Sequence, residues 1–179
     1  MTTLETALPA RIVPIDEAHI ESFHAALDSV AREHQYLAFL EAPPLASVRD
    51  FVLGNIRAGN PQLVAIVDGR VIGWCDVLPK DRPTRRHSGV LGIGLIEPFR
   101  GHRIGSALMT ATIEAAWRKG LTRIELTVRT DNARAQRLYE KLGFMVEGCL
   151  RHDMLIDGEY VDALLMAQLK ENDPRSAGR

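Results

Sequence analysis

The chain has 179 residues, of which 46% are hydrophobic and 25% are charged, and its formal net charge at pH 7 is −1. This near-neutral charge argues against general binding to nucleic acid or to an anionic membrane surface, because both need an excess of basic residues. The length favours a single domain over residues 1–179, with a core over about 11–170 and flexible tails. We find no apolar run long enough to span a bilayer and no secretion-signal pattern, so we expect a cytoplasmic protein.

The first half of the chain predicts a strand, two helices and a hairpin. Residues 11–15 form a short β-branched run, and Pro14 within it indicates an edge strand. Two amphipathic helical patterns follow, and Ser47 is the expected N-cap of the second. Two apolar runs then flank Asp68–Gly69, which is the signature of a hairpin with a type I′ turn.

The second half predicts a β-α-β unit followed by a helix and another hairpin. The unit comprises a central strand over 87–96, a helix over 103–119 and an alternating strand over 123–129. A helix opening at Asn132 or the preceding aspartate comes next, and Asp157–Gly158 marks the second hairpin. The order β-α-α-β-β-β-α-β-α-β-β predicts an α/β fold, a mixed sheet with helices on both faces. The β-α-β unit should be a right-handed parallel crossover.

A cation-rich corner, "PFRGHRIGSALM", joins the predicted central strand to the next helix. The first N–H groups of a helix have no partner inside the helix and carry partial positive charge, which suits a phosphate. Several consecutive amides favour a diphosphate over a monophosphate. The alternative is an ordinary strand-to-helix turn with solvated basic residues.

The stretch "RGHRIGSALM" resembles the phosphate-loop motif of the GNAT superfamily of N-acetyltransferases, and "DNARAQRLYEKLGF" resembles the next motif of that superfamily. Within it, the chain is most similar to bacterial L-amino-acid N-acetyltransferases. The resemblance implies a GNAT-like acyl-CoA N-acyltransferase fold, acetyl-CoA as the donor, and a primary amine that attacks the thioester directly.

The resemblance also implies residues that contact the cosubstrate. The end of the central strand would pair with the pantetheine arm, the loop after it would cradle the diphosphate, and Tyr139 would act as general acid for the sulfur. The implied set is Ile93, Gly94, Leu95, Arg100, Gly101, His102, Arg103, Ile104, Gly105, Ser106, Asn132 and Tyr139. The alternatives are structural: a tightly packed strand, a helix cap at Asn132, and helix-to-sheet packing by Tyr139.

Arg103 stands where the family motif has its first glycine. A β-carbon at positive φ would cost about 1–2 kcal/mol. We therefore predict that Arg103 has right-handed helical geometry in the first turn, with its amide toward the phosphate and its guanidinium alongside.

Two residues, Glu125 and His87, are candidates for the general base. Some relatives carry a glutamate on the strand before the asparagine, at the position of Thr127 here. Glu125 lies two residues earlier on the same face and could act through a water, or else form a salt bridge with Arg123 or Arg129. His87 is a further candidate for a proton relay.

The acceptor pocket is expected between the two N-terminal helices, the "EAPPL" segment and the second hairpin. Polar residues of that hairpin are candidates for holding an amino acid, or are ordinary solvated positions: Arg151, His152, Asp153, Glu159, Tyr160 and Asp162.

The cysteines and histidines indicate neither a disulfide framework nor a metal site. Cys75 and Cys149 lie in separate apolar runs, and we expect both to be reduced core thiols. The histidines show no spacing with cysteines or carboxylates that is typical of metal ligands, so we expect no metal.

The resemblance implies an acetyl-CoA-dependent N-acetyltransferase acting on a free L-amino acid or an amino-acid-like small molecule. One alternative is a protein or peptide N-alpha-acetyltransferase, and another is a non-catalytic acyl-CoA-binding sensor. The expected partners are a small-molecule amine and a second copy of the chain in a homodimer, with neither nucleic acid nor membrane.

Overall fold

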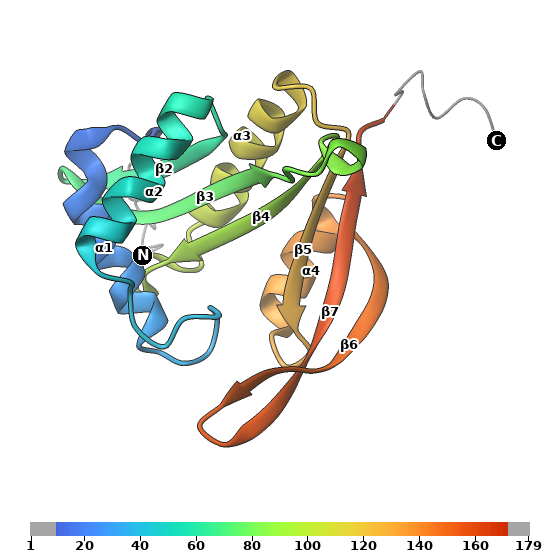
Figure 1. Ribbon diagram of the computed structural model, residues 1–179. Helices are drawn as coiled ribbons and strands as arrows, with labels where there is room; N and C mark the ends of the chain where they lie inside the picture. The colour runs from blue at the N-terminus through green and yellow to red at the C-terminus, as the bar shows by residue number, and fades with distance from the viewer. Residues whose placement is uncertain (1–9, 172–179) are drawn as a thin grey trace, which may run out of the picture.

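The computed structural model describes residues 10–171, and over this range the chain forms one seven-stranded sheet flanked by helices (Figure 1). The strand order across the sheet is β1-β2-β3-β4-β5-β7-β6. The strands are β1 (Arg11–Pro14), β2 (Gln62–Val67), β3 (Arg70–Pro79), β4 (Ser88–Leu95), β5 (Arg123–Arg129), β6 (Met145–Ile156) and β7 (Glu159–Leu169). The helices are α1 (Ile20–Ala31), α2 (Leu45–Ala58), α3 (Ile104–Arg118) and α4 (Ala133–Lys141), with short 3₁₀ turns between them. This order is the predicted one, and the α/β mixed sheet is confirmed.

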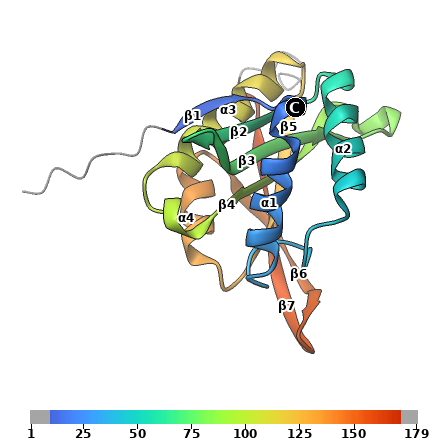
Figure 2. The ribbon, with the colours of Figure 1, turned by 90° about the vertical axis from the view of Figure 1, so that its left-hand side faces the viewer.

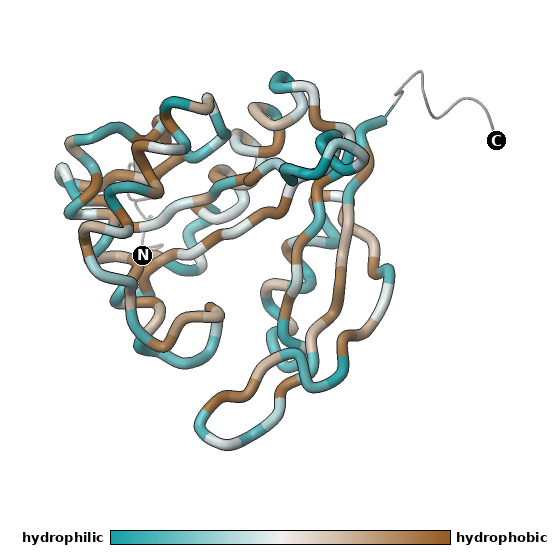
Figure 3. The backbone as a smooth tube through the Cα atoms, in the orientation of Figure 1, coloured by the Kyte–Doolittle hydropathy of each residue, from teal (hydrophilic) through white to brown (hydrophobic). Residues whose placement is uncertain are grey.

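Helices cover both faces of the sheet, because each central strand is apolar on both sides. Val64 and Ile66 of β2 pack with α1 and α2, whereas Ala65 and Val67 pack with α3 and α4. Figure 2 shows α1 and α2 on one side of the sheet and α4 on the other. Figure 3 shows hydrophobic stretches in the strands and a hydrophilic connection between β3 and β4. No helix within residues 10–171 is long and apolar enough to cross a membrane.

The turn signals in the sequence are confirmed. Asp68 and Gly69 have φ of 49° and 75°, and Val67 pairs with Arg70, as a two-residue type I′ turn requires. Asp157 and Gly158 have φ of 51° and 86° in the second hairpin. The strand that contains Pro14 is at the sheet edge, where a missing N–H costs no ladder bond.

Two local predictions are wrong. The N-cap of the second helix is Pro44, three residues before Ser47, because Pro44 is the last residue with an extended ψ (142°) and the chain is helical from Leu45. Cys149 is exposed rather than in the core, because β6 is the edge strand and little packs against it, whereas Cys75 is fully buried.

The feature that positions the site is the divergence of β4 and β5. These parallel strands pair only from Ser88 to Val90, and beyond that point they separate (Figure 1). Ile96 donates its N–H to the carbonyl of Ile72 in β3. Because successive residues of a strand direct their N–H and C=O groups to opposite sides, the main-chain groups of Ile93 and Leu95 point away from β3. They face the unpaired side of β4, toward the diverging β5.

Candidate active site

The loop between β4 and α3 presents a row of open main-chain donors. Within residues 10–171, the six consecutive N–H groups from Gly101 to Ser106 donate to no protein acceptor, and the first helical bond into this loop comes from Ala107. The amide of Arg100, by contrast, donates to the carbonyl of Glu97 at 3.1 Å. Six adjacent donors at a helix N-terminus form an anion site that suits a diphosphate.

The prediction for Arg103 is wrong. It is the N-cap of α3 and has left-handed geometry, with φ of 62° and ψ of 5°. Gly101, two residues earlier, also has positive φ, at 93°. Backbone of this kind turns successive N–H groups toward one side and makes a concave site for an anion. The arginine therefore takes the conformation of the motif's glycine, at a cost of about 1–2 kcal/mol.

The two arginines at this loop differ in whether their guanidinium groups are paired with other protein groups. Arg100 forms a bidentate ion pair with Glu33 of the α1–α2 connection, donates to the carbonyl of Leu95 at 2.8 Å, and lies over the Tyr36 ring at 4.6 Å. Its guanidinium therefore orders the α1–α2 connection. Arg103 is exposed and forms no ion pair within the described chain.

Arg134 is a cation near the loop that the sequence did not single out. Its Nη2 lies 3.6 Å from the position that a β-carbon on Gly101 would occupy. It is the second residue of α4, and the motif that contains Tyr139 also contains it. The position of Arg134 in that motif could have identified it as a candidate. The sequence alone, however, does not show that the side chain of Arg134 lies next to the loop.

Tyr139 lies on the α3–α4 face of the sheet, below the open side of β4. It is buried, its ring centroid is 6.1 Å from that of Phe144, and its hydroxyl makes no hydrogen bond to residues 10–171. Burial, together with the neighbouring Cys75, raises the pKa of Tyr139. Cys75 is the register partner of Ile93, so the phenol lies near the segment of β4 that faces the gap.

The structural alternatives for Asn132 and Gly94 are both observed. The Asn132 side chain caps α4 by accepting from the amide of Ala135 at 3.1 Å. A β-carbon on Gly94 would stand 2.2 Å from the Trp74 ring, so this glycine is required for packing between β3 and β4. Asn132 keeps its side-chain NH₂ available for a ligand.

Glu125 forms a salt bridge, as one of the sequence interpretations expected. It pairs with Lys80 and Arg123, and Arg123 also holds Glu147. Burial alone would raise the pKa of Glu125, but hydrogen bonds from Lys80 and Arg123 outweigh it and lower the pKa. Its proton affinity is therefore low, which is unfavourable for a base. His87 is exposed and its ring makes no hydrogen bond in the described part of the chain.

Asp76 is a buried carboxylate that the sequence interpretation missed. It lies in β3 with 7% of its surface exposed, and no described residue donates a hydrogen bond or forms an ion pair with it. Burial raises its pKa to about 7. The sequence does contain a hint, because Asp76 is the one acidic residue in the apolar run "RVIGWCDVLP". A strand pattern does not reveal, however, whether such an acid forms an ion pair or a hydrogen bond with another residue.

The α1–α2 connection bridges the open ends of β4 and β5 on the α1–α2 face. Beyond the Glu33–Arg100 pair, the His34 carbonyl accepts from Arg129 at 3.0 Å, and the His34 ring lies 3.1 Å from the carboxylate of Asp157. The connection and the second hairpin therefore meet at the contact between His34 and Asp157. Of the hairpin candidates, His152 stacks on Tyr160 at 4.3 Å, its amide bonds Asp162 at 2.7 Å, and Arg151, Asp153 and Glu159 are exposed.

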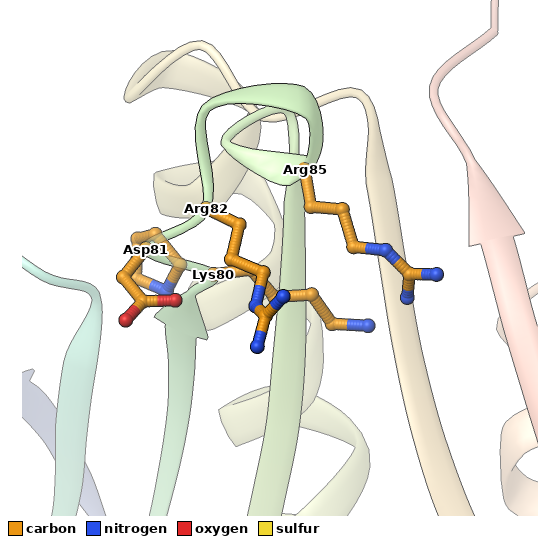
Figure 4. Close-up of a pocket in the computed structure, with 5 residues that line it drawn as sticks. Lys80, Asp81, Arg82 and Arg85 are labelled. Atoms are coloured by element: carbon orange, nitrogen blue, oxygen red, sulfur yellow. The ribbon is translucent and has the colours of Figure 1, made fainter.

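A separate open hollow lies at the other end of β4. Its lining comes from the β3–β4 connection, including Lys80, Asp81, Arg82 and Arg85 (Figure 4). This connection precedes β4, whereas the row of open amides follows it, so the hollow is remote from the loop at 101–106. Its lining residues are mostly exposed, and Lys80 is engaged with Glu125.

Comparison with known proteins places this geometry in a family. L-amino acid N-acetyltransferase AaaT of Escherichia coli K12 is 42% identical over 116 residues, which cover 64% of this chain and 71% of that protein. An N-alpha-acetyltransferase of Sulfurisphaera tokodaii is 38% identical over 115 residues, covering 58% and 66% of the two chains.

Among solved structures, the phosphinothricin acetyltransferase of Sinorhizobium meliloti in complex with AcCoA matches with a TM-score of 0.85 at 20% identity, covering 92% of this chain and 91% of that one. Ribosomal-protein-alanine N-acetyltransferase of Brucella melitensis matches with a TM-score of 0.84 at 24% identity, covering 89% and 99%. At these identities the structures establish a shared fold. The profile of the acetyltransferase (GNAT) family matches residues 16–144, which is most of the chain, and the chain therefore belongs to that family of enzymes.

Proposed function

We propose that this acetyltransferase transfers the acetyl group of acetyl-CoA to the amine of a free L-amino acid or a similar small molecule. The observation that supports acetyl-CoA most directly is the row of six open N–H groups from Gly101 to Ser106 beside the unpaired side of β4. The similarity to the E. coli L-amino acid N-acetyltransferase supports the acceptor class.

Acetyl-CoA would supply an acetyl group activated as a thioester. The open amides would hold its diphosphate, with charge added by His102, Arg103 and Arg134. The main-chain groups of Ile93 and the N–H of Leu95 would orient the pantetheine arm, as an added strand does at a sheet edge.

Tyr139 would donate a proton to the departing sulfur. Because burial raises its pKa, the phenol stays protonated throughout the neutral range and is available as a donor. A sensor that only binds acyl-CoA would have no use for a buried, unpaired phenol at this place, which favours turnover over sensing.

The α-amine of a peptide is the second candidate acceptor, because the Sulfurisphaera relative is an N-alpha-acetyltransferase. The α1–α2 connection argues for a smaller acceptor. It is tied to Arg100, Arg129 and Asp157, and so spans the acceptor face where a longer peptide would have to leave the site.

An amine panel with a thiol-release assay tests the proposal. The panel contains free L-amino acids, their D-enantiomers and short peptides of matched N-terminal residue. We expect turnover of one or more free L-amino acids, with kcat/KM at least tenfold above the matched peptide. Preference for the peptides would overturn the acceptor assignment.

Thermal unfolding with acetyl-CoA separates an enzyme from a sensor. Ligand at a hundred times its Kd stabilises the fold by about 2.7 kcal/mol. Stabilisation without thiol release from any amine would favour the sensor, and absence of stabilisation would remove the acetyl-CoA site at 101–106.

A further inference from the structure

We propose that Asp76 is the general base of this enzyme: its carboxylate reaches the acceptor amine across Gly92 and removes the proton of the ammonium group. This inference rests on the proposed function, because it assigns a further catalytic residue to that transfer. Four features of the structure support it: the place of Asp76 in the sheet, its relation to Tyr139, its lack of charged neighbours, and the chain of amides beside it.

The first feature is the position of Asp76 beside the gap between β4 and β5. Asp76 pairs with Gly92 of β4, and Gly92 is two residues beyond Val90, where pairing with β5 ends. Asp76 Oδ1 lies 3.3 Å from the point where a β-carbon on Gly92 would stand. Of the three glycines of β4, Gly89 and Gly94 are covered by apolar side chains, whereas at Gly92 the only atoms near the missing side chain belong to Asp76.

The second feature is that Asp76 and Tyr139 approach the same stretch of β4 from opposite faces. Tyr139 lies near Cys75, on the α3–α4 face, and Cys75 pairs with Ile93. Asp76 follows Cys75 in β3, so it points to the α1–α2 face, where the acceptor pocket is expected. Because the amide row at 101–106 lies beyond the end of β4, a ligand held there and along β4 extends its reactive end back toward Gly92.

The third feature is that no residue in the described range 10–171 pairs with the carboxylate. Its neighbours on the α1–α2 face are Gln62 of β2, Gly92 of β4, and Trp74 and Leu78 of its own strand, and none of these is charged. On β5 this face carries Glu125, whose charge is balanced by Lys80 and Arg123. Burial alone raises the pKa of Asp76 to about 7, which is near the optimum for a base at neutral pH.

The fourth feature is a chain of side-chain amides that ends beside Asp76. Asn60 donates to Asn55 Oδ1 at 3.0 Å, and Asn55 Nδ2 donates to Gln62 Oε1 at 2.9 Å. This fixes the orientation of Gln62, whose buried Nε2 has no partner among the described residues. Gln62 is the direct register partner of Asp76, but its Nε2 makes no hydrogen bond to the carboxylate, so the fixed amide leaves Asp76 free to accept a proton.

The proton balance is complete with these groups. Asp76 takes one proton from the acceptor ammonium and later releases it to solvent. The nitrogen lone pair forms the new bond to the acetyl carbon, and the carbon–sulfur bond breaks with its electron pair going to sulfur. Tyr139 gives its proton to that sulfur and is reprotonated through solvent by the second proton that the nitrogen loses. The net products are the N-acetylated acceptor, free CoA and one proton.

Kinetics of Asp76→Asn test the assignment. We expect kcat/KM to fall by about 10²–10⁴-fold. In the wild-type enzyme kcat/KM should fall as the pH drops through about 7, because the carboxylate becomes protonated, and the variant should lack this acid limb. An aminooxy or hydrazide analogue of the acceptor, whose amine is already neutral, should be acetylated by the variant at close to the wild-type rate. Loss of activity with both kinds of acceptor would overturn the proposal.

Three further variants serve as comparisons, each checked for folding by thermal unfolding. Gly92→Ala pushes on Asp76 Oδ1 and should lower kcat by up to about a hundredfold through misplacement of the carboxylate. Asp50→Asn changes an exposed aspartate on α2 and should leave the profile intact. Glu125→Gln should keep the acid limb of the pH profile. If the acid limb is lost in Glu125→Gln but kept in Asp76→Asn, Glu125 rather than Asp76 is the general base.

A failure of the proposed acceptor would be distinguishable from a failure of this assignment. If peptides rather than amino acids are acetylated, the same variants are compared on the peptide. If no amine is acetylated, infrared difference spectra between the wild type and Asp76→Asn still report the carboxyl group. A carboxyl that ionises near pH 7 supports the proposal, and one that is fully ionised at pH 5 overturns it.

Discussion

At the scale of single residues, Arg103 shows that the backbone of the loop matters more than the side chain that occupies it. The arginine has φ of 62°, a conformation that glycine adopts without strain. The loop keeps this geometry although the residue is not glycine, because it gathers the amides of 101–106 on one side. The backbone strain at Arg103 therefore lowers the stability of the fold, and a substitution that tolerates positive φ should remove it.

Replacing Arg103 with glycine should stabilise the fold. Relief of the left-handed strain should raise the free energy of unfolding by about 1 kcal/mol, which is about 2–4 °C in Tm for a chain of this size. Because the amides remain, affinity for CoA should fall only by the loss of one side-chain charge. Thermal unfolding and CoA titration measure the two effects.

Arg103→Ala is the matched control, because it removes the same charge but keeps the β-carbon at positive φ. It should lose the same CoA affinity and gain no stability. Equal stabilisation of both variants would show that the side chain of Arg103, rather than its backbone geometry, destabilises the wild type.

The residues that sequence could and could not identify differ in a physical way. Tyr139 and the 101–106 loop lie in local stretches that resemble motifs of the GNAT superfamily, and it was that resemblance that indicated them. Asp76 was missed because its significance depends on Gly92 and Gln62, which belong to neighbouring strands. The prediction for Arg103 was wrong because it considered only the steric cost of a positive φ for a residue with a β-carbon. The positive φ of Arg103 is required by the path of the whole loop, which the residue type does not reveal.

At the scale of elements, the contact between β3 and β4 is a tight one in which glycines make room for large neighbours. A β-carbon on Gly94 would stand 2.2 Å from Cη2 of the Trp74 ring, and one on Gly73 would stand 2.9 Å from the carbonyl oxygen of Gly94. Trp74 in turn packs edge-on against Phe23 of α1, with centroids 5.5 Å apart. Gly94 therefore fixes how α1 sits on the sheet.

Gly94→Ala should destabilise the protein by about 1–3 kcal/mol, because the added carbon forces the buried Trp74 ring to move. Gly105→Ala is the comparison. A β-carbon there meets Leu138 and Ile93 at ordinary distances of 3.8 and 3.9 Å, and alanine is the better residue in a helix. Urea unfolding of both variants measures the difference. Equal loss of stability would mean that α3 is packed more tightly than these distances imply.

The order and type of the elements followed from the sequence because they are set locally. Alternation in the central strands, the 3.6-residue period of the helices, and Asp-Gly at both tight turns each depend on neighbouring residues. The start of α2 at Leu45 and the exposure of Cys149 did not follow. The first depends on the backbone of Pro44, and the second on which strand occupies the edge of the finished sheet.

At the scale of the whole molecule, the early end of the pairing between β4 and β5 leaves one side of β4 open. β5 pairs with β7 along its full length but with β4 only as far as Glu125. This leaves main-chain groups of β4 facing a gap, continuous with the open amides after it. Sequence indicated that these two strands are neighbours, but their separation depends on how each packs on its other side. The gap is therefore a property of the assembled sheet.

If the gap and the loop form one binding surface, acetyl-CoA should protect both from hydrogen exchange. The amides at 101–106 have no acceptor within residues 10–171, so they should exchange rapidly in the free protein. At ligand concentrations near a hundred times Kd, their exchange and that of Ile93 and Leu95 should slow by up to about a hundredfold, because only the free fraction exchanges. The β3–β4 connection at 80–87 lies at the other end of β4 and should be unchanged. Protection at 80–87 with none at 101–106 would place the ligand in the hollow of Figure 4 and would contradict the site.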